Sequence, residues 1–391
     1  MNQGKYVFSQ IMQYIFDYQF NKCVEKYNGH YRLRSLTCWE QFLAMSFGQL
    51  SYRESLRDLI ICLRSQKQKI YHLGFRSEIS RATLARMNEK RDWRIFRDLA
   101  SILIEQAKNL YVNDKGFRID LNGSCYVIDS STIELCFNIF KWARLIKARA
   151  SIKLHLLLDL KGNIPSFFHI SSGKMYDGFF LDIIEFETGA YYIIDRGYLD
   201  FERLFKINSA GSFFVVRAKK NFVFKRLYSR KIDKSTGVKC DQIIKLSNYQ
   251  ASKKYSDKLR KIKYFDKETK RYFVFLTNDF KLDSKIIAEL YKQRWQIELF
   301  FKWIKQHLKI KVFWGYSENA VKTQICIAVC TYLLVAIIKK QLKIKRNLYE
   351  ILQILSVSLF DKSPLNKLLS EVELQIVKEH CQKQRSLWDF K

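Results

Sequence analysis

Residues 125–129 read CYVID and residues 191–195 read YYIID, so two short apolar runs each lead directly into an aspartate. Short apolar runs rich in tyrosine, valine and isoleucine are typical of buried β-strands. In an open α/β sheet, ligands bind just beyond the carboxyl ends of the strands. The sequence therefore predicts that Asp129 and Asp195 lie at one functional edge of a sheet. An aspartate in this position also commonly caps a helix or starts a turn, so neither residue alone decides the function.

The residues around these two runs supply the other elements of a sheet. Apolar runs at 152–158 and 164–170 flank the turn signal DLKGN, which predicts an antiparallel hairpin. Helices are expected over 177–186 and 199–206, and a further strand over 213–216. This order of strands and helices resembles that of an RNase H-like fold, in which a hairpin leads into a parallel portion. We expect an α/β protein with a mixed sheet and flanking helices, whose first part spans 121–216.

Residues 1–118 are expected to form an all-helical N-terminal domain, because their apolar residues recur at three- and four-residue spacing. Ser80 or Thr83 is a candidate cap for a helix with many basic residues. Those residues are Arg81, Arg86, Lys90, Arg91 and Arg94. A short helix with a basic face suits a helix-turn-helix-like reader of DNA, and a helical bundle with a solvated basic side is the alternative.

Three further segments follow the first part of the core. Residues 217–278 are rich in predicted strands, and RAKKNFVFKRLYSRK (217–231) is strongly basic without a single acid. We expect a β-rich insertion whose alternating cations and aromatics suit a groove for a DNA backbone; a solubilising β flap is the alternative. Residues 279–345 are expected to complete the catalytic core with helices, and residues 346–391 to form a C-terminal helical tail.

The chain is strongly basic. It has 391 residues with 69 Lys and Arg against 38 Asp and Glu, which gives a formal net charge of +31. Such an excess makes the folded chain repel itself, and a polyanionic partner offsets that cost. Nucleic acid is the usual partner of this kind, so the charge favours a DNA-binding protein over a basic protein without a specific partner.

The cysteines and the apolar segments indicate a cytoplasmic, DNA-associated protein with no membrane partner. The nine cysteines have irregular spacing and no Cys-x-x-Cys pair, so neither a disulfide framework nor a structural zinc site is expected. The N-terminus lacks the charged and long apolar blocks of a secretory signal. The longest apolar run, 325–338, is short for a bilayer span and is expected to be a core helix, part of a helix near 321–338.

A long helix expected over 283–309 carries a row of four polar side chains. These are Tyr291, Arg294, Glu298 and Lys305. At roughly 100° per residue, their spacing confines them to an arc of about 60°. An apolar stripe lies next to this row, so docking the stripe on the sheet directs the row towards the strand ends. Alternating charges on one helix face also form plain salt-bridge ladders, which is the alternative here.

The row Y-x2-R-x3-E-x6-K resembles the signature of a large branch of bacterial insertion-sequence transposases, the Tyr-Arg-Glu-Lys (YREK) branch of the DDE recombinases. The resemblance extends to Asp129 on the first strand, to DRGY (195–198) around the second aspartate, and to Thr277 and Asn278. A β insertion between the second aspartate and the glutamate is a further feature of that branch. The N-terminal region resembles the DNA-binding domain of the family only loosely.

The resemblance implies a cut-and-paste DNA transposase with an RNase H-like fold. Its catalytic and metal-binding residues would be Asp129, Asp195 and Glu298, and its DNA-binding residues Tyr291, Arg294 and Lys305. The implied cofactor is a pair of Mg²⁺ ions, for which Mn²⁺ would substitute; carboxylates are the ligands that such hard cations prefer. The implied partners are double-stranded DNA, as transposon ends and as target, and a second copy of the chain on that DNA.

Some questions stay open at the level of sequence. In some relatives the flanking strand is released through a DNA hairpin with a base flipped onto an aromatic residue, and Trp295, Trp303 and Trp314 are equal candidates. An inactive transposase-derived DNA-binding protein is expected to lose one carboxylate, and all three are present here. A metal-dependent DNA nuclease would carry the same carboxylates, so only its products distinguish it.

Overall fold

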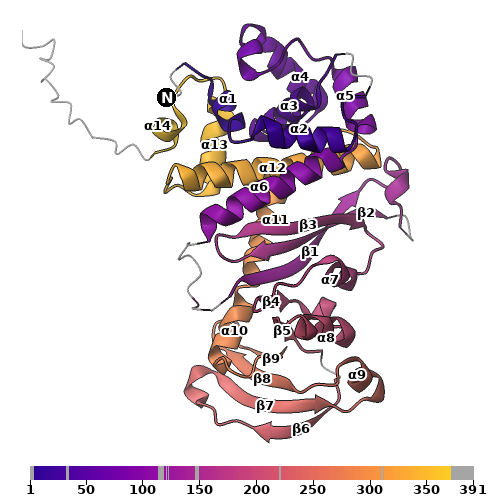
Figure 1. Ribbon diagram of the computed structural model, residues 1–391, viewed down its shortest axis with the longest axis vertical. Coiled ribbons are helices and arrows are strands. Elements are labelled where there is room, and N and C mark those ends of the chain that lie inside the picture. Colours follow the sequence, from indigo (N-terminus) through magenta and orange to yellow (C-terminus); the bar gives the residue numbers. More distant parts are fainter. Residues whose placement is uncertain are drawn as a thin grey trace, which may run out of the picture.

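The computed structural model of the chain describes residues 4–31, 35–112, 119, 121, 123–145, 149–219, 222–308, 310 and 312–370. Its described strands form one mixed nine-stranded sheet with helices on both faces (Figure 1). The strands in chain order are β1 (Cys125–Leu135), β2 (Ala150–Asp159), β3 (Ile164–Ser172), β4 (Tyr191–Ile194), β5 (Phe213–Arg217), β6 (Phe224–Ser229), β7 (Val238–Leu246), β8 (Leu259–Asp266) and β9 (Arg271–Thr277).

Helices precede, interrupt and follow the strands. Those before the sheet are α1 (Val7–Met12), α2 (Asp17–Lys26), α3 (Cys38–Leu50), α4 (Leu56–Ser65), α5 (Arg81–Lys90) and α6 (Arg94–Tyr111). Those between strands are α7 (Phe180–Ile183), α8 (Phe201–Ser209) and α9 (Tyr249–Lys254). Those after the last strand are α10 (Ser284–Lys292), α11 (Trp295–His307), α12 (Glu318–Gln341), α13 (Leu348–Ser358) and α14 (Leu365–Leu369). Residues 371–391 of the expected C-terminal tail lie outside the described residues.

The strand order in the sheet is β3-β2-β1-β4-β5-β9-β8-β7-β6. β1, β4 and β5 are parallel neighbours, whereas every other neighbouring pair is antiparallel. The predicted hairpin over 152–158 and 164–170 is confirmed as β2 and β3. The strands of the expected insertion join β5 through β9, so they continue the same sheet and form its lower end in Figure 1.

Side-chain alternation explains why both faces of the sheet are covered. In β1, Cys125 and Val127 belong to one hydrophobic core, and Tyr126 and Ile128 to the other. The first core is shared with α6, α11 and α12 and with the N-terminal helices, and the second with α7 and α8. We call these two surfaces of the sheet the α11 face and the α8 face. The N-terminal helices and the sheet therefore share one continuous core.

α12 lies alongside α6, between the N-terminal helices and the sheet (Figure 1). It is the one helix in the described part of the chain that is long and apolar enough to cross a membrane, and 94% of its most apolar window is buried within the fold. A helix that is apolar all round is stable in water only when other elements surround it. The core helix predicted near 321–338 is therefore confirmed.

Two predicted elements differ from the structure. β1 does not end at Asp129 but continues to Leu135, because β2 keeps pairing with it beyond that point, with Asp129 opposite Leu156. The helix expected over 177–186 is only a 3₁₀ turn followed by the four residues of α7. Gly178 in the first turn weakens a helix at this position.

Candidate active site

The two strand aspartates are neighbours at the same level of the sheet. The parallel pairing of β1 with β4 ends at Ile128 with Ile194. Asp129 follows Ile128 and Asp195 follows Ile194. Adjacent strands are about 4.8 Å apart, so the two aspartates lie close together. The residues two positions earlier belong to the core of the α11 face, so both aspartates point to that face.

The expected long helix is two helices, α10 and α11, which are separated by Gln293 and Arg294. At this junction the Arg294 N–H donates to the Tyr291 carbonyl at 3.1 Å, and the Ile297 N–H to the Arg294 carbonyl at 3.2 Å. Both bonds span three residues, which tightens the backbone into a 3₁₀ turn. The prediction of one uninterrupted helix over 283–309 is therefore wrong, and its last residue lies outside the described ones. The tighter turn brings Tyr291 and Arg294 almost into line.

Three side chains of the polar row meet at the strand aspartates. The Tyr291 hydroxyl donates to Asp195 Oδ1 at 3.3 Å. The Arg294 guanidinium donates to Asp129 Oδ2 at 3.2 Å and, through its other terminal nitrogen, to Glu298 Oε1. One cation thus holds the glutamate of α11 beside the aspartate of β1, and the second aspartate directly follows the neighbouring strand.

Lys305 lies farther along β1 than the other three residues of the row. Its ammonium group donates to the carbonyl oxygen of Thr132 at 2.9 Å. Thr132 follows Asp129 by three residues, which is about 10 Å along a strand. The row therefore extends outward along β1 and does not converge on one point.

Burial, together with the charges around it, explains the unusual pKa of Asp129. Burial is the largest cause that raises the pKa of Asp129 to about 6, and the carboxylates of Asp195 and Glu298 add to it. The Ser130 N–H and the positive charge of Arg294 act in the opposite direction. Neighbouring carboxylates ionise together more readily when a positive charge lies close to them. In this structure Arg294 supplies that charge.

All three candidate ligands are carboxylates, which suit a hard divalent cation. Within the described ranges, however, no group of three or more His, Cys, Asp and Glu side chains is gathered closely enough to hold a metal ion. The geometry gives the reason, because the guanidinium of Arg294 bonds to both Asp129 and Glu298. A metal ion at these carboxylates therefore requires that Arg294 release at least one of them.

The sequence analysis missed a second polar group beside Asp129. The Ser130 hydroxyl donates to Asp177 Oδ1 at 2.8 Å, and the Lys153 ammonium group donates to the same oxygen at 2.9 Å. Tyr198 is buried close by, and its pKa is raised first by burial and then by the surrounding aspartates. Only Ser130 is adjacent to a candidate residue in sequence. Asp177 follows β3 at the start of the segment predicted as a helix over 177–186, and that prediction did not indicate which residues its side chain contacts.

The three candidate tryptophans differ in exposure. Trp295 begins α11 directly after Arg294 and is 58% exposed. Trp314 is buried, and Trp303 is partly buried, with its ring 4.8 Å from that of Tyr332. Only Trp295 therefore presents most of its ring to solvent near the carboxylates.

The predicted basic helix is α5. It begins after Ser80, whose hydroxyl accepts a hydrogen bond from the Thr83 N–H at 3.1 Å, so Ser80 is the cap. Arg81, Arg86 and Lys90 are exposed on this helix. These three cations are available to a polyanion.

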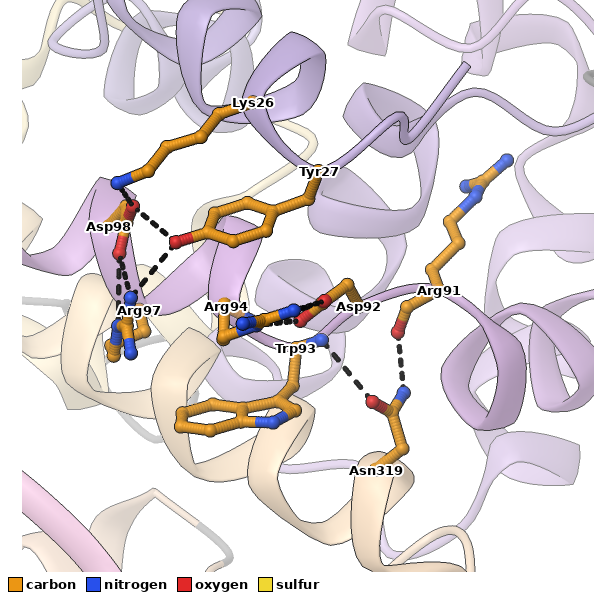
Figure 2. Close-up of polar contacts among 9 residues, drawn as sticks. All are labelled: Lys26, Tyr27, Arg91, Asp92, Trp93, Arg94, Arg97, Asp98 and Asn319. Carbon is orange, nitrogen blue, oxygen red and sulfur yellow. Dashed lines mark hydrogen bonds and ion pairs between the residues drawn. The ribbon is translucent and has the colours of Figure 1, made fainter. Parts of the chain in front are cut away.

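The other two arginines of this group lie in the turn between α5 and α6 or directly after it, where their contacts are within the fold (Figure 2). Arg91 is buried, and its carbonyl accepts from the Asn319 amide of α12. The same amide accepts a hydrogen bond from the Trp93 N–H at 3.3 Å. Arg94 pairs with Asp92 at 2.6 Å. α12 therefore fixes the turn between α5 and α6.

Comparison with known families and curated proteins gives matches over both parts of the chain. Residues 121–334 match a family model described as "Transposase DDE domain", and residues 3–76 match one described as "Domain of unknown function (DUF4372)". A putative transposase of Sinorhizobium fredii is 34% identical over 260 residues, which cover 65% of this chain and 70% of that protein. A probable transposase for an insertion sequence element of Geobacillus stearothermophilus is 31% identical over 225 residues, 56% of this chain and 58% of that protein.

Two further similarities are more distant. A putative transposase for an insertion sequence element of Synechocystis is 25% identical over 280 residues, covering 70% of this chain and 76% of that protein. Among solved structures, a piggyBac transposase synaptic complex with hairpin DNA has a TM-score of 0.47 at 10% identity, covering 95% of this chain and 84% of that one.

Proposed function

The chain belongs to the DDE transposase family and is a transposase, and from this premise we propose that Asp129, Asp195 and Glu298 are the carboxylates that carry its chemistry. One relationship supports the assignment above all. Asp129 on β1 and Asp195 directly after β4 follow the last paired residues of two parallel strands, and Arg294 links Glu298 to Asp129. The three proposed carboxylates thus come from two neighbouring strands and one helix that are far apart in the sequence.

The proposed cofactor is a pair of Mg²⁺ ions, or Mn²⁺ in their place, with the three carboxylates as ligands. Such ions, when bound, activate the attacking water or 3′ hydroxyl and stabilise the leaving oxygen during phosphodiester cleavage and strand transfer. Asp129, Asp195 and Glu298 would hold these ions through their carboxylate oxygens, the ligand type that such hard cations prefer.

We further propose that Tyr291, Arg294, Glu298 and Lys305 form the YREK signature. The hydroxyl of Tyr291 and the guanidinium of Arg294 lie at the carboxylates, where their donors suit a DNA phosphate. Arg294 has two successive tasks in this proposal. It neutralises Asp129 and Glu298, and a metal ion at these acids would leave its donors available to a DNA phosphate. Lys305 serves a second phosphate farther along β1.

The strand order supports an RNase H-like catalytic core. The antiparallel β3-β2-β1 part continues into the parallel β1-β4-β5 part, with the aspartates on β1 and directly after β4. We propose five segments. These are a helical DNA-binding domain (1–118), the first part of the core (121–216), a β insertion (217–278), the second part of the core (279–345) and a C-terminal helical tail (346–391).

The proposed partners are the double-stranded terminal repeats of the element, the target DNA, and a second copy of the chain when assembled on DNA. The net charge of +31 and the exposed cations of α5 support the DNA partner. We place this activity in the bacterial cytoplasm, where the DNA is.

Replacement of the proposed glutamate tests the assignment. Glu298→Ala should abolish Mg²⁺-dependent cleavage of a duplex that carries the terminal sequence of the element, while the duplex still binds. Glu289→Ala is the matched control, because Glu289 lies on α10 and pairs with Lys285 away from the aspartates. Its cleavage and strand joining should match those of the parent. Undiminished cleavage by Glu298→Ala would overturn the assignment.

A further inference from the structure

Arg217 is the next residue in the row of strand ends that holds the two aspartates. β4 and β5 are parallel and pair Ile194 with Val216, as β1 and β4 pair Ile128 with Ile194. The residues that follow these pairs on the three neighbouring strands are Asp129, Asp195 and Arg217. At a strand spacing of about 4.8 Å, Arg217 is one strand from the second aspartate and two from the first.

Arg217 also points to the same face as the aspartates. Val215 belongs to the core of the α11 face and Val216 to that of the α8 face, so the next side chain extends to the α11 face. The guanidinium lies 4.9 Å from the ring centre of Phe273 on β9. Burial raises the pKa of Tyr291, and Arg217 is near enough to oppose that shift. Tyr291 is the residue whose hydroxyl contacts the second aspartate.

The two arginines of this face differ in their partners. Arg294 is committed to Asp129 and Glu298. Arg217, among the residues that the structure describes, pairs with no carboxylate and rests on the ring of Phe273. A guanidinium stacked on a ring keeps the N–H groups at its edge available for a bidentate bond to a phosphate. Arg217 can therefore bind an anion without first breaking an ion pair.

The neighbouring β8–β9 hairpin extends the sheet beyond Arg217. Arg217 is opposite Phe275, and the β8–β9 hairpin continues for four more residue pairs to Asp266 with Arg271. That distance is about 13 Å beyond the level of the aspartates. Lys292, at the end of α10, bonds to Asp266 at 2.7 Å and so ties this projecting tip to the helices of the α11 face. A strand of DNA that leaves the carboxylates towards β9 meets Arg217 first.

We propose that Arg217 binds a phosphate of the DNA strand adjacent to the phosphate at the carboxylates, on the side of β9. The proposal rests on the proposed function of those carboxylates. It adds a DNA-binding residue outside the YREK row, supplied by the strand that leads into the insertion.

The test measures binding without cleavage. The dissociation constant for a duplex with the terminal sequence of the element is determined at several salt concentrations, with divalent ions omitted. Arg217→Ala should weaken binding about ten-fold, as expected for loss of a hydrogen bond to a charged group. The slope of log affinity against log salt should fall by about 0.9, the value for one phosphate contact. Arg217→Lys should keep the slope but not the full affinity, because it keeps the charge and loses the fork.

Lys161→Ala is the control for the loss of one positive charge. Lys161 lies in the β2–β3 turn beside Cys125, the first residue of β1, which is four residues or about 13 Å along the strand from Asp129. Its affinity and salt slope should equal those of the parent. Equal losses in Lys161→Ala and Arg217→Ala, or a parental slope in Arg217→Ala, would overturn the proposal. Arg217→Gln repeats the measurement if Arg217→Ala does not show the parental thermal unfolding.

Two further measurements distinguish DNA from a free anion as the ligand, and failure of this inference from failure of the carboxylate assignment. Inorganic phosphate at constant ionic strength should not displace the duplex. Displacement that disappears in Arg217→Ala would assign the residue to a free anion instead of DNA. Glu298→Ala is assayed for cleavage in the same series. If it loses cleavage while Arg217→Ala binds as the parent does, this inference fails and the carboxylate assignment stands; if it still cleaves, the carboxylate assignment itself fails.

Discussion

The guanidinium of Arg294 donates to the carboxylate of Asp129 at 3.2 Å, and this bond joins the turn between α10 and α11 to the middle of β1. The same guanidinium bonds to Glu298. One cation therefore balances two acids that we propose as metal ligands. The order of events at the site follows from this arrangement, because a metal ion competes with Arg294 for the same oxygens.

Arg294→Ala should make the protein depend on divalent metal for stability. Without the guanidinium, the neighbouring carboxylates repel one another, and the free energy of unfolding in a chelator should fall by about 1–3 kcal/mol. Mg²⁺ no longer has to displace an arginine, so it should bind more tightly and raise the melting temperature more than in the parent. Thermal unfolding with chelator and with Mg²⁺ measures both effects.

Arg203→Ala is the control for that experiment. Arg203 is as buried as Arg294 and pairs with Asp182 at 2.7 Å, but its partner is not one of the three carboxylates. Its loss should lower the melting temperature equally in chelator and in Mg²⁺. The same Mg²⁺ response in Arg294→Ala as in the parent would show that Arg294 and the metal do not compete.

Asp129 should make stability in the absence of metal depend on pH. Burial, followed by the other two carboxylates, raises its pKa from the ordinary 3.8 to about 6. Between these values the folded chain holds more protons than the unfolded chain, so a rise in pH favours unfolding. The resulting decrease in the free energy of unfolding is absent below about pH 4, grows up to about pH 6 and then stays constant at roughly 3 kcal/mol.

Asp129→Asn removes the ionisable group, so comparison with the parent measures the destabilisation that ionised Asp129 causes. The variant should gain stability relative to the parent as the pH rises from 4 to 7, as measured by urea unfolding in a chelator. Asp159, whose pKa burial also raises to about 6, titrates in both proteins and cancels in the comparison. A difference between the two proteins that is equal at pH 4 and pH 7 would rule out the assigned shift.

The site shows which parts of a fold a single sequence specifies. Local patterns placed Asp129 and Asp195 next to the right strands, since a buried parallel strand is a short apolar run. They did not give the end of β1, because pairing with β2 depends on residues far along the chain. They also did not predict the break between α10 and α11 at Gln293 and Arg294, since neither residue is a glycine or proline. Arg217 was visible only as one cation in a basic stretch until the register of β4 and β5 placed it beside Asp195.

Lys305→Ala should weaken the processing of transposon ends with little effect on stability. The ammonium group contacts the Thr132 carbonyl beyond the carboxylates, where a phosphate about 10 Å along the strand is expected. Cleavage of the terminal duplex at limiting protein should fall about ten-fold, as for one charged contact. Lys302→Ala, which removes an exposed lysine of the same helix, should cleave normally. Equal cleavage rates for the two variants would show that Lys305 is a solvated surface residue without a role in end processing.

The exposed cations of α5 should contribute to DNA binding but not to the chemical step. Deletion of residues 1–118 does not test this, because the N-terminal helices share their core with α12 and the sheet, and their removal exposes it. Arg86→Ala combined with Lys90→Ala leaves that core intact. It should lower the salt slope of binding to the terminal duplex by about 1.8, two contacts' worth, while cleavage at saturating DNA stays near the parental rate. The comparison is Arg57→Ala with Arg64→Ala, which removes two exposed arginines of α4. If both pairs lower the slope equally, α5 is not a DNA-binding helix but part of a general basic surface.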